Sequence, residues 1–378
     1  MTKHDYKQNA YYVIYLIRCI LHNKVPSKEK LDKMDLEQLF EVAKAHSLAA
    51  MTAYALESAG IYDPAFEEEK NKAIRKNILF DAQRSKLLGV LEEQKIWYMP
   101  LKGAVLKGIY PQIGMRQMAD NDILFDMSRR NDVRQIMSDL GFVLKAEREV
   151  VDEYLKEPIY NFEMHGELFM EYQVGDMADY YHGIKERILK DDNNNYGYHF
   201  SNEEFYLFML AHEYKHFILD GTGIRSLVDT YVFLNKYSDT LDWAYVNSEL
   251  DKMGITDYEN KNRELSLKVF DGAALSDAEK LLLNSYIISN TYGSLDNKVE
   301  RGVQNNGGNA FAKFKYAVMR LTVPFSPDNP RYKAFEISYP FFYKHKIFLP
   351  LLPIIRPVYY AVKNRKRAFS ELKTLIKL

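Results

Sequence analysis

Apolar residues recur at helical spacing through most of the first 95 residues. In the stretch DLEQLFEVAKAHSLAAMTAYALESAG, Leu36, Leu39 and Phe40 lie near one face of a helix, and Gly60 ends the pattern. The stretch FEEEKNKAIRKNILFDAQRSKLLGVLEEQ continues as a long amphipathic helix. We therefore expect residues 5–95 to be helical.

Short apolar runs bounded by turn residues follow. IWYMPLKG (96–103), DNDILFD (120–126) and FVLKAE each predict a strand, and SRRNDVRQIMSDLG predicts a helix before the last of them. YNFEMHGELFMEYQV (160–174) predicts a hairpin that turns near Gly166. The middle of the chain is therefore predicted to alternate helices and strands, with mixed strand directions.

Helical spacing returns from Asn202 to about Ser289. A Gly/Asn-rich linker (303–310), a segment rich in Pro and aromatic residues, and a basic end follow it. We predict an α+β protein in four parts. These are N-terminal helices (1–74), an α/β core (75–195), a helical domain (196–300), and a linker with the C-terminal segment (301–378).

The charge is small overall but uneven along the chain. The net charge is -1, yet nine Lys/Arg and one acid between Phe341 and Leu378 give that segment +8 and the first 340 residues -9. Two interpretations of its last part, KNRKRAFSELKTLIKL, remain open: a solvated helix packed on the protein's own body, or a contact for an anionic lipid, a nucleic acid or an acidic partner. One cysteine, no apparent signal peptide and no run of about 18 apolar residues predict a cytoplasmic protein without a spanning helix.

Candidate metal ligands begin at the second predicted strand. Asp120 and Asp122 are two residues apart, so a strand would project both carboxylates from one face. Mg²⁺ binds through one or two carboxylates plus substrate phosphates. Glu171, expected in the middle of a later strand, would supply a third carboxylate for a two-metal site. Lys102-Gly103, between a strand and a helix, could receive phosphates.

Each of these motifs is weak alone, because a D-x-D is more often a solvated loop with two acids. Their order resembles the nucleotidyltransferase superfamily with the DNA polymerase β-like fold, and more closely the bacterial uncharacterised nucleotidyltransferase family. Members of that family carry an L-K-G turn, R-x-M-x-D-x-D, an H-x-x-K-H helix and G-x-R-x-x-x-D. The matching residues here are Leu101-Lys102-Gly103, Arg116 to Asp122 with Met118, Asp120 and Asp122, then His212, Lys215, His216, Gly223, Arg225 and Asp229.

The resemblance implies a nucleotidyltransferase core with a mixed sheet, flanked by N-terminal helices and a C-terminal helical domain. It implies transfer of an NMP from an NTP to an unknown hydroxyl-bearing acceptor, with release of pyrophosphate. Two Mg²⁺ ions would be held by Asp120, Asp122 and Glu171, or Glu171 would act as the general base. The nucleotide would be contacted by Lys102, Gly103, Arg116, His212, Lys215 and Arg225, with Asp229 orienting Lys215 or Arg225.

The family often has E-L-H-W around its third acid, whereas this chain has Glu171-Tyr172-Gln173-Val174. The glutamate matches and the histidine does not. An alternative function is therefore a degenerate module that binds nucleotides or partners without transferring a nucleotide.

The stretch AHEYKHF also contains H-E-x-x-H, the spacing of a zinc metallopeptidase. Three interpretations compete: a zinc site, structural histidines on a buried helix, or a polar face turned toward phosphates. On a helix His212, Lys215 and His216 share one side while Glu213 points elsewhere, which favours phosphates. Arg225 and Asp229 are four residues apart on a helix, so the alternative to a role at the triphosphate is a routine surface salt bridge between them.

Overall fold

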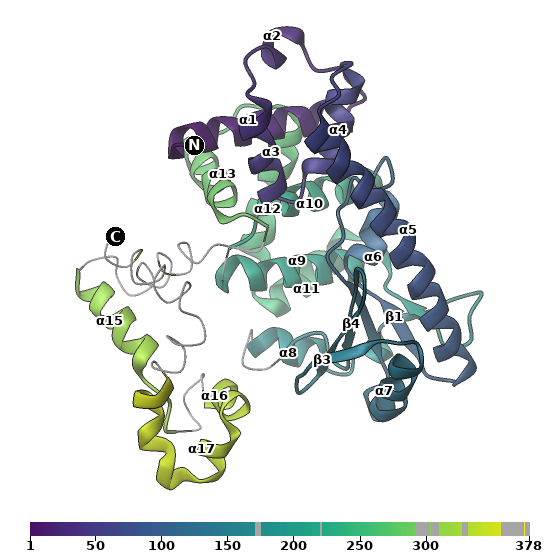
Figure 1. Ribbon diagram of the computed structural model, residues 1–378, viewed down its shortest axis with the longest axis vertical. Coiled ribbons are helices and arrows are strands. Elements are labelled where there is room, and N and C mark those ends of the chain that lie inside the picture. Colours follow the sequence, from purple (N-terminus) through teal and green to yellow (C-terminus); the bar gives the residue numbers. More distant parts are fainter. Residues whose placement is uncertain are drawn as a thin grey trace.

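The computed structural model describes residues 1–170, 175–219, 221–291, 310–326 and 332–356, with the isolated residues 299, 303 and 374. Figure 1 shows the N-terminal helices at one end of the body, the sheet at the other, and further helices between them. Glu171, most of the predicted linker and almost all of the basic end lie outside the described residues.

The first part of the chain is helical, as predicted. Its helices are α1 (Lys3–Leu21), α2 (Lys28–Leu31), α3 (Leu36–Ala45), α4 (Ala49–Ser58) and α5 (Pro64–Glu93). Asp63 begins α5, because its side chain accepts hydrogen bonds from the N–H groups of Ala65 and Phe66 while Pro64 occupies the first turn. This 30-residue helix then runs along the sheet (Figure 1).

Five strands form one mixed sheet in the order β1-β2-β5-β4-β3. They are β1 (Tyr98–Pro100), β2 (Asn121–Phe125), β3 (Val143–Glu147), β4 (Val151–Lys156) and β5 (Tyr160–His165). Strands β2 and β5 are parallel, whereas the other neighbouring pairs are antiparallel. The predicted strands at 96–103, 120–126 and FVLKAE are therefore confirmed, as is the mixed direction.

The predicted hairpin around Gly166 is wrong. Strand β5 pairs antiparallel with β4, which precedes it, and the connection is residues 157–159. After β5, residues 166–169 form bends instead of a returning strand. Gly166 thus follows the end of β5 instead of turning a hairpin. Strand β5 itself lies in the middle of the sheet, between β2 and β4.

Alternation along β2 and β5 gives the sheet two different faces. One face packs under α5 and α7 (Arg130–Asp139) and is apolar, formed by Ile123, Phe125, Phe162 and Met164 with Leu87, Leu91 and Met137. The intervening residues, which include Asp122, Glu163 and His165, project from the opposite face. The sheet therefore has one structural face and one polar face.

The polar face is covered by the second helical part. It comprises α9 (Asn202–Leu219), α10 (Ile224–Tyr237), α11 (Trp243–Met253), α12 (Thr256–Asp271) and α13 (Asp277–Ser289). The buried side of α9 shares a core with Met99, Leu101 and Leu124 of the sheet region. That contact fixes the distance between α9 and the polar face.

The N-terminal helices α1, α3 and α4 share another core with α10, α12 and α13. Helices from the ranges 1–74 and 196–300 are thus packed together, although these two ranges are far apart in the chain. The four-part division remains a prediction. The smaller elements are α6 (Gly103–Leu106), α8 (Gly175–Tyr181), β6 (Leu189–Lys190), β7 (Tyr198–His199), α15 (Ala310–Leu321), α16 (Tyr332–Ser338) and α17 (Pro340–Lys344).

Candidate active site

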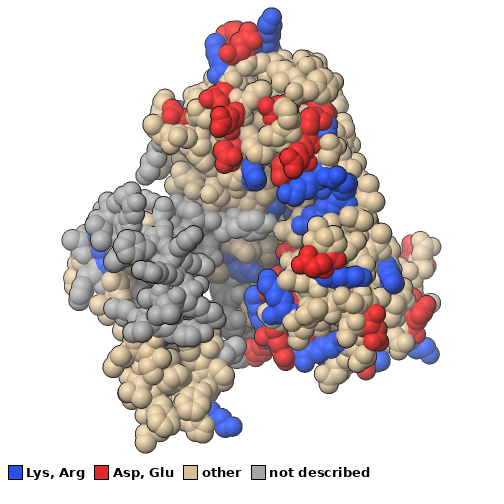
Figure 2. All heavy atoms as spheres, viewed as in Figure 1, with Lys and Arg blue, Asp and Glu red and all other residues tan. Residues whose placement is uncertain are grey.

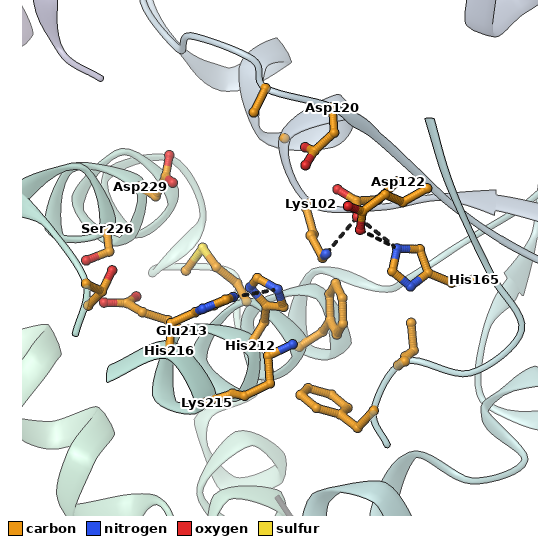
Figure 3. Close-up of a pocket in the computed structure, with 18 of the residues that line it drawn as sticks. Lys102, Asp120, Asp122, His165, His212, Glu213, Lys215, His216, Ser226 and Asp229 are labelled. Carbon is orange, nitrogen blue, oxygen red and sulfur yellow. Dashed lines mark hydrogen bonds and ion pairs between the residues drawn. The ribbon is translucent and has the colours of Figure 1, made fainter. Parts of the chain in front are cut away.

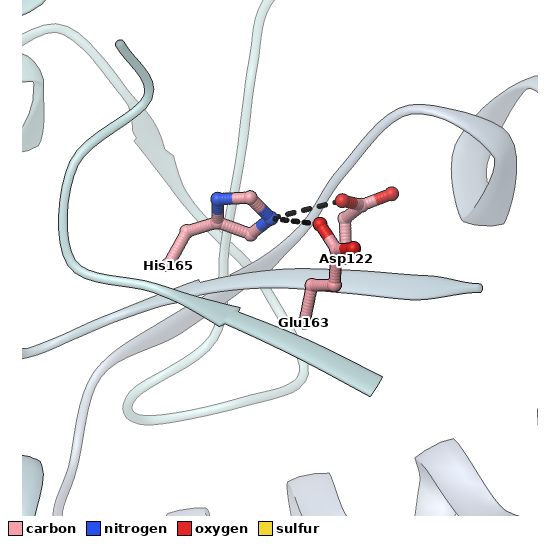
Figure 4. Close-up of side chains that lie close together, drawn as sticks. All are labelled: Asp122, Glu163 and His165. Carbon is pink, nitrogen blue, oxygen red and sulfur yellow. Dashed lines mark hydrogen bonds and ion pairs between the residues drawn. The ribbon is translucent and has the colours of Figure 1, made fainter. Parts of the chain in front are cut away.

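The parallel pairing of β2 with β5 brings two carboxylates and an imidazole together. Asp122 is directly opposite Glu163 in the register, and His165 follows two residues later on the same face. His165 Nε2 lies 2.9 Å from Asp122 Oδ1 and 3.6 Å from Glu163 Oε2. Figure 4 shows the three side chains converging. In the part of the chain that the structure describes, this is the only group of three such residues whose possible metal ligands all lie within 4.8 Å.

Asp122 is buried beside two groups that favour its ionised form. Burial alone would raise its pKa, but the charge of Lys102 and the hydrogen bond from His165 hold the pKa below the usual range. Lys102 Nζ donates to Asp122 Oδ1 at 2.7 Å. Because the carboxylate is ionised, His165 Nε2 carries the proton and donates it to the same oxygen. Asp122 is therefore a fixed anion at neutral pH.

The other two carboxylates are less readily ionised. Asp120 stands just before β2 and lines the same cavity, and burial followed by the charge of Asp122 raises its pKa. Burial, Asp122 and Asp120 likewise raise the pKa of Glu163 to about 7. Mutual repulsion among buried carboxylates means that a bound cation would stabilise all three. This is the electrostatic condition that a metal site requires.

The opposite wall of the cavity is cationic. His212 and Lys215 lie on the side of α9 that faces the sheet, as Figure 3 shows, and Arg225 of α10 also lines this space. Burial, then the charge of Lys102, lowers the pKa of Lys215 to about 8. The cavity has a volume of about 510 Å³ and lies between Lys215 and Arg225 on one side and the carboxylates of the sheet on the other. An anion placed here would relieve the repulsion between Lys215 and Lys102.

The start of α10, which carries Arg225, is fixed by the N-terminal helices. The N–H of Ile224 donates to Nδ1 of the fully buried His46, at 3.2 Å. A Cβ on Gly223 would lie 2.6 Å from backbone atoms of Asn290 and 2.7 Å from His46 Nδ1, so only glycine fits there. The glycine of G-x-R-x-x-x-D thus allows three segments to meet where the helix begins.

Asp229 binds a different cation from those predicted. Its two oxygens accept hydrogen bonds from Arg116 Nε and Nη2 at 2.9 and 3.0 Å, and the Tyr110 hydroxyl donates to Oδ1 at 2.6 Å. The expected pairing with Arg225, or orientation of Lys215, is replaced by this buried two-pronged contact across the sequence. The pair joins the segment before β2 to α10, so it sets the separation of the two walls of the cavity.

Gly103 has a related structural role. A Cβ there would lie 2.5 Å from Arg116 Nη1 and 2.8 Å from Met118 Sδ. The preceding residue, Lys102, has a positive φ of 49° at the start of α6. Leu101-Lys102-Gly103 therefore turns the chain tightly enough to aim Lys102 at Asp122 while leaving space for Arg116.

A comparison with protein families agrees with this arrangement. The model of the family described as "Uncharacterised nucleotidyltransferase" matches residues 32–270, which include every residue of the cavity's two charged walls. The chain belongs to this family. No curated protein and no solved structure matches it. The expected family and the mixed α+β nucleotidyltransferase core are thereby confirmed.

In this member of the uncharacterised nucleotidyltransferase family, two residues that line the cavity, Glu163 and His165, were not predicted from the sequence. Glu163-Met164-His165 has the E-x-H order that resembles the family's third-acid motif, eight residues before Glu171. The signal was present but was assigned to the first arm of a hairpin. Glu171 itself lies outside the described residues, so its role as the third ligand stays a prediction.

The two histidines of H-E-x-x-H adjoin each other without a third ligand nearby among the described residues. The Nε2 atoms of His212 and His216 are 3.3 Å apart. Burial, followed by the charges of Lys102 and Lys215, lowers the pKa of His212 well below its ordinary value. Neither histidine belongs to the three-residue group that could hold a metal in the described chain. Helix α9 thus presents a polar face to the cavity, as the phosphate interpretation of its sequence predicts.

Glu213, the would-be base of a peptidase, turns toward α12. Its Oε1 accepts a hydrogen bond from Asn262 Nδ2 at 3.0 Å. Burial raises its pKa to about 7, against an ordinary value of 4.5. Since its folded pKa is the higher one, it contributes stability that is full below about pH 4.5 and is lost as pH rises through about 7.

Replacing Glu213 with glutamine should therefore flatten the pH dependence of stability. Relative to E213Q, the wild-type protein is expected to lose on the order of 3 kcal/mol of unfolding free energy between about pH 5 and pH 8. Urea unfolding of both proteins across this range measures the difference. If the unfolding free energies of the two proteins changed in parallel with pH, the pKa of Glu213 would not be raised in the folded protein.

Breaking the Arg116–Asp229 pair should destabilise the protein strongly. Arg116→Met leaves a buried carboxylate without its charge partner, so we expect a loss of about 3–5 kcal/mol in the free energy of unfolding. Lys261→Met is the matched control, since it breaks a pair with Asp257 whose side chains are 62% and 83% exposed. The control should cost less than about 1 kcal/mol. Equal losses in the two variants would mean that the Arg116 contact is not a structural tie.

Proposed function

We propose that this protein transfers an NMP from an NTP to a hydroxyl-bearing acceptor and releases pyrophosphate, using divalent metal ions. One observation carries the proposal: the register of β2 and β5 places Asp122 beside Glu163, facing Lys215 and Arg225 across a single cavity. Carboxylates suit metal ions, and the opposing cations suit the phosphates that accompany them. Membership of the nucleotidyltransferase family supports the same reaction.

The donor set fits magnesium through its oxygens. Asp120, Asp122 and Glu163 offer carboxylates, the ligands that Mg²⁺ prefers, and we propose that they hold the metal ions. Glu163 thus takes the role that the sequence assigned to Glu171. His165 Nε2 already donates to Asp122, so we assign it the orientation of that ligand instead of direct coordination. When bound, the metal ions would stabilise negative charge on the phosphoryl oxygens.

The charged residues outside the metal site would either act on the triphosphate or hold the site in place. Transfer forms a bond between the acceptor oxygen and the α-phosphorus and breaks the bond from that phosphorus to the bridging oxygen of the leaving pyrophosphate, and the proton of the acceptor's hydroxyl is released to water. Lys215 and Arg225 are placed to offset the charge that builds on the pyrophosphate. Lys102 keeps Asp122 ionised, and the Arg116–Asp229 pair positions α10. The acceptor's hydroxyl, on a sugar, small molecule, protein or RNA end, enters the same cavity.

The test is transfer in the presence of candidate acceptors. The purified protein is incubated with each NTP, radiolabelled at the α-phosphate, in cell extract with Mg²⁺, and the labelled product is identified. We expect one class of molecule to become labelled, and chelation of the metal to prevent it. Calorimetry that shows NTP·Mg²⁺ binding while no molecule is labelled would contradict the proposal and support a binding module.

A further inference from the structure

The C-terminal helices form a small lobe with a core of its own. Val323, Tyr332, Tyr343, Leu349 and Leu352 are buried together, and the Tyr343 hydroxyl donates to the carbonyl of Pro324 at 2.8 Å. The lobe lies beyond the residues matched by the family, 32–270, and apart from the sheet and α9 in Figure 1, and none of its described residues lines the cavity. It therefore has no evident part in the proposed reaction.

The outer side of this lobe is also apolar. Six large hydrophobic side chains in its last 16 described residues are exposed, and we call them the outer apolar surface: Phe341, Ile347, Phe348, Leu351, Ile354 and Ile355. Ile347 is 83% exposed and Ile354 is 69% exposed. Ile347 and Leu351 lie in a short 3-10 helix (Lys346–Leu351), and Ile354 and Ile355 lie in the helical turn that follows it, while Leu349 and Leu352 between them are buried. A group of exposed apolar side chains of this kind commonly marks a contact with a protein or a membrane.

The charged residues of the segment 339–356, which carries the outer apolar surface, all have one sign. Residues 339–356 contain Lys344, Lys346 and Arg356 and no Asp or Glu. Figure 2 shows the lobe as a tan surface interrupted by blue, without red on the face in view. The sequence after residue 356 adds six Lys/Arg against Glu371 alone. Charge repulsion thus disfavours covering this surface with the same surface of a second copy.

We propose that the outer apolar surface docks the protein onto an anionic lipid membrane. Apolar side chains would enter the boundary between headgroups and acyl chains while Lys344 and Lys346 contact the anionic headgroups. In the described part of the chain, no helix has the length and apolarity needed to cross a bilayer, so the contact lies along the membrane surface. The charged cavity would then work on acceptors presented close to that surface.

Vesicle sedimentation with the full-length protein tests this inference. We expect the protein to bind vesicles of phosphatidylcholine mixed with phosphatidylglycerol, to bind pure phosphatidylcholine at least about tenfold more weakly, and to dissociate as salt is raised. Equal binding to the two kinds of vesicle, or binding to neither, would overturn the proposal.

Two variants separate the contributions. Ile347→Ser/Ile354→Ser should reduce binding to the anionic vesicles by about tenfold or more, because the side chains that insert are lost. Lys344→Gln/Lys346→Gln should reduce it while keeping the apolar side chains. The matched control is Leu281→Ser/Ile78→Ser, at two exposed apolar positions elsewhere, which should bind as the wild type does.

A protein partner would give a different result. If the wild type self-associates, and Ile347→Ser/Ile354→Ser abolishes self-association while vesicle binding is unchanged, the surface is an interface between copies and the membrane proposal is wrong. Circular dichroism of each variant establishes that the fold is retained, as expected for substitutions of exposed side chains.

Discussion

Replacing Asp120 and Asp122 together with asparagine is expected to reduce nucleotide transfer by at least about a thousandfold. Both residues line the cavity, and Asp122 is the carboxylate that Lys102 and His165 hold ionised. Asparagine keeps the size of each side chain but removes the charge that would hold a metal ion. Transfer of label from an NTP labelled at the α-phosphate measures the loss.

The matched control makes the same chemical change on the surface. Asp257→Asn/Asp277→Asn removes two carboxylates whose side chains are 83% and 96% exposed on α12 and α13. This variant should transfer at the wild-type rate. If D120N/D122N also retained the wild-type rate while remaining folded, these carboxylates would not be part of the catalytic site.

The second large effect distinguishes the two candidates for the third ligand. Glu163→Gln should reduce transfer by about a hundredfold or more, because Glu163 stands opposite Asp122 in the sheet and supplies the other carboxylate of the group. Glu171→Gln, the same substitution eight residues later, should keep the rate within a few fold. The ratio of the two rates measures which glutamate acts in the reaction. Loss of transfer in E171Q with normal transfer in E163Q would reverse the assignment.

Periodicity predicted most of the fold because most elements have one clearly apolar side. Helices α1, α3–α5 and α9–α13 follow from the spacing of their buried residues, and strand β2 follows from a short apolar run. Strand β4 did not, because its sequence, VDEYLK, places two acids in a buried stretch. Arg130 and Arg134 of α7 both donate to Asp152, and Arg148 pairs with Glu153. Those partners make the acids tolerable inside the fold, but a local pattern does not reveal them.

The missing strand explains the error about the third carboxylate. Without β4, the most plausible partner for β5 was the segment after Gly166, which moved the expected acid to Glu171. With β4 in place, β5 lies between β4 and β2, and its alternation puts Glu163 and His165 on the face of Asp122. The D-x-D motif can be recognised from the local sequence, whereas the third carboxylate of the site depends on the order of the strands in the sheet.

Long-range pairing limited the prediction of the cations as well. Asp229 was expected to pair with Arg225 because side chains four residues apart on a helix are neighbours. Arg116, 113 residues away, makes a buried two-pronged contact instead. Such a two-pronged contact offsets the cost of burying Asp229. The position of Lys215 on the H-x-x-K-H helix could be predicted without knowing a distant partner, and the structure places this lysine on the cavity wall.

The most direct measurement of the central claim compares the fate of two phosphates. The wild-type protein is incubated with Mg²⁺, cell extract and the same NTP labelled either at its α- or at its γ-phosphate. We predict that the α-label passes to the acceptor while the γ-label is released in pyrophosphate. Label passing to the acceptor from the γ-phosphate alone, or from neither position, would contradict nucleotidyl transfer.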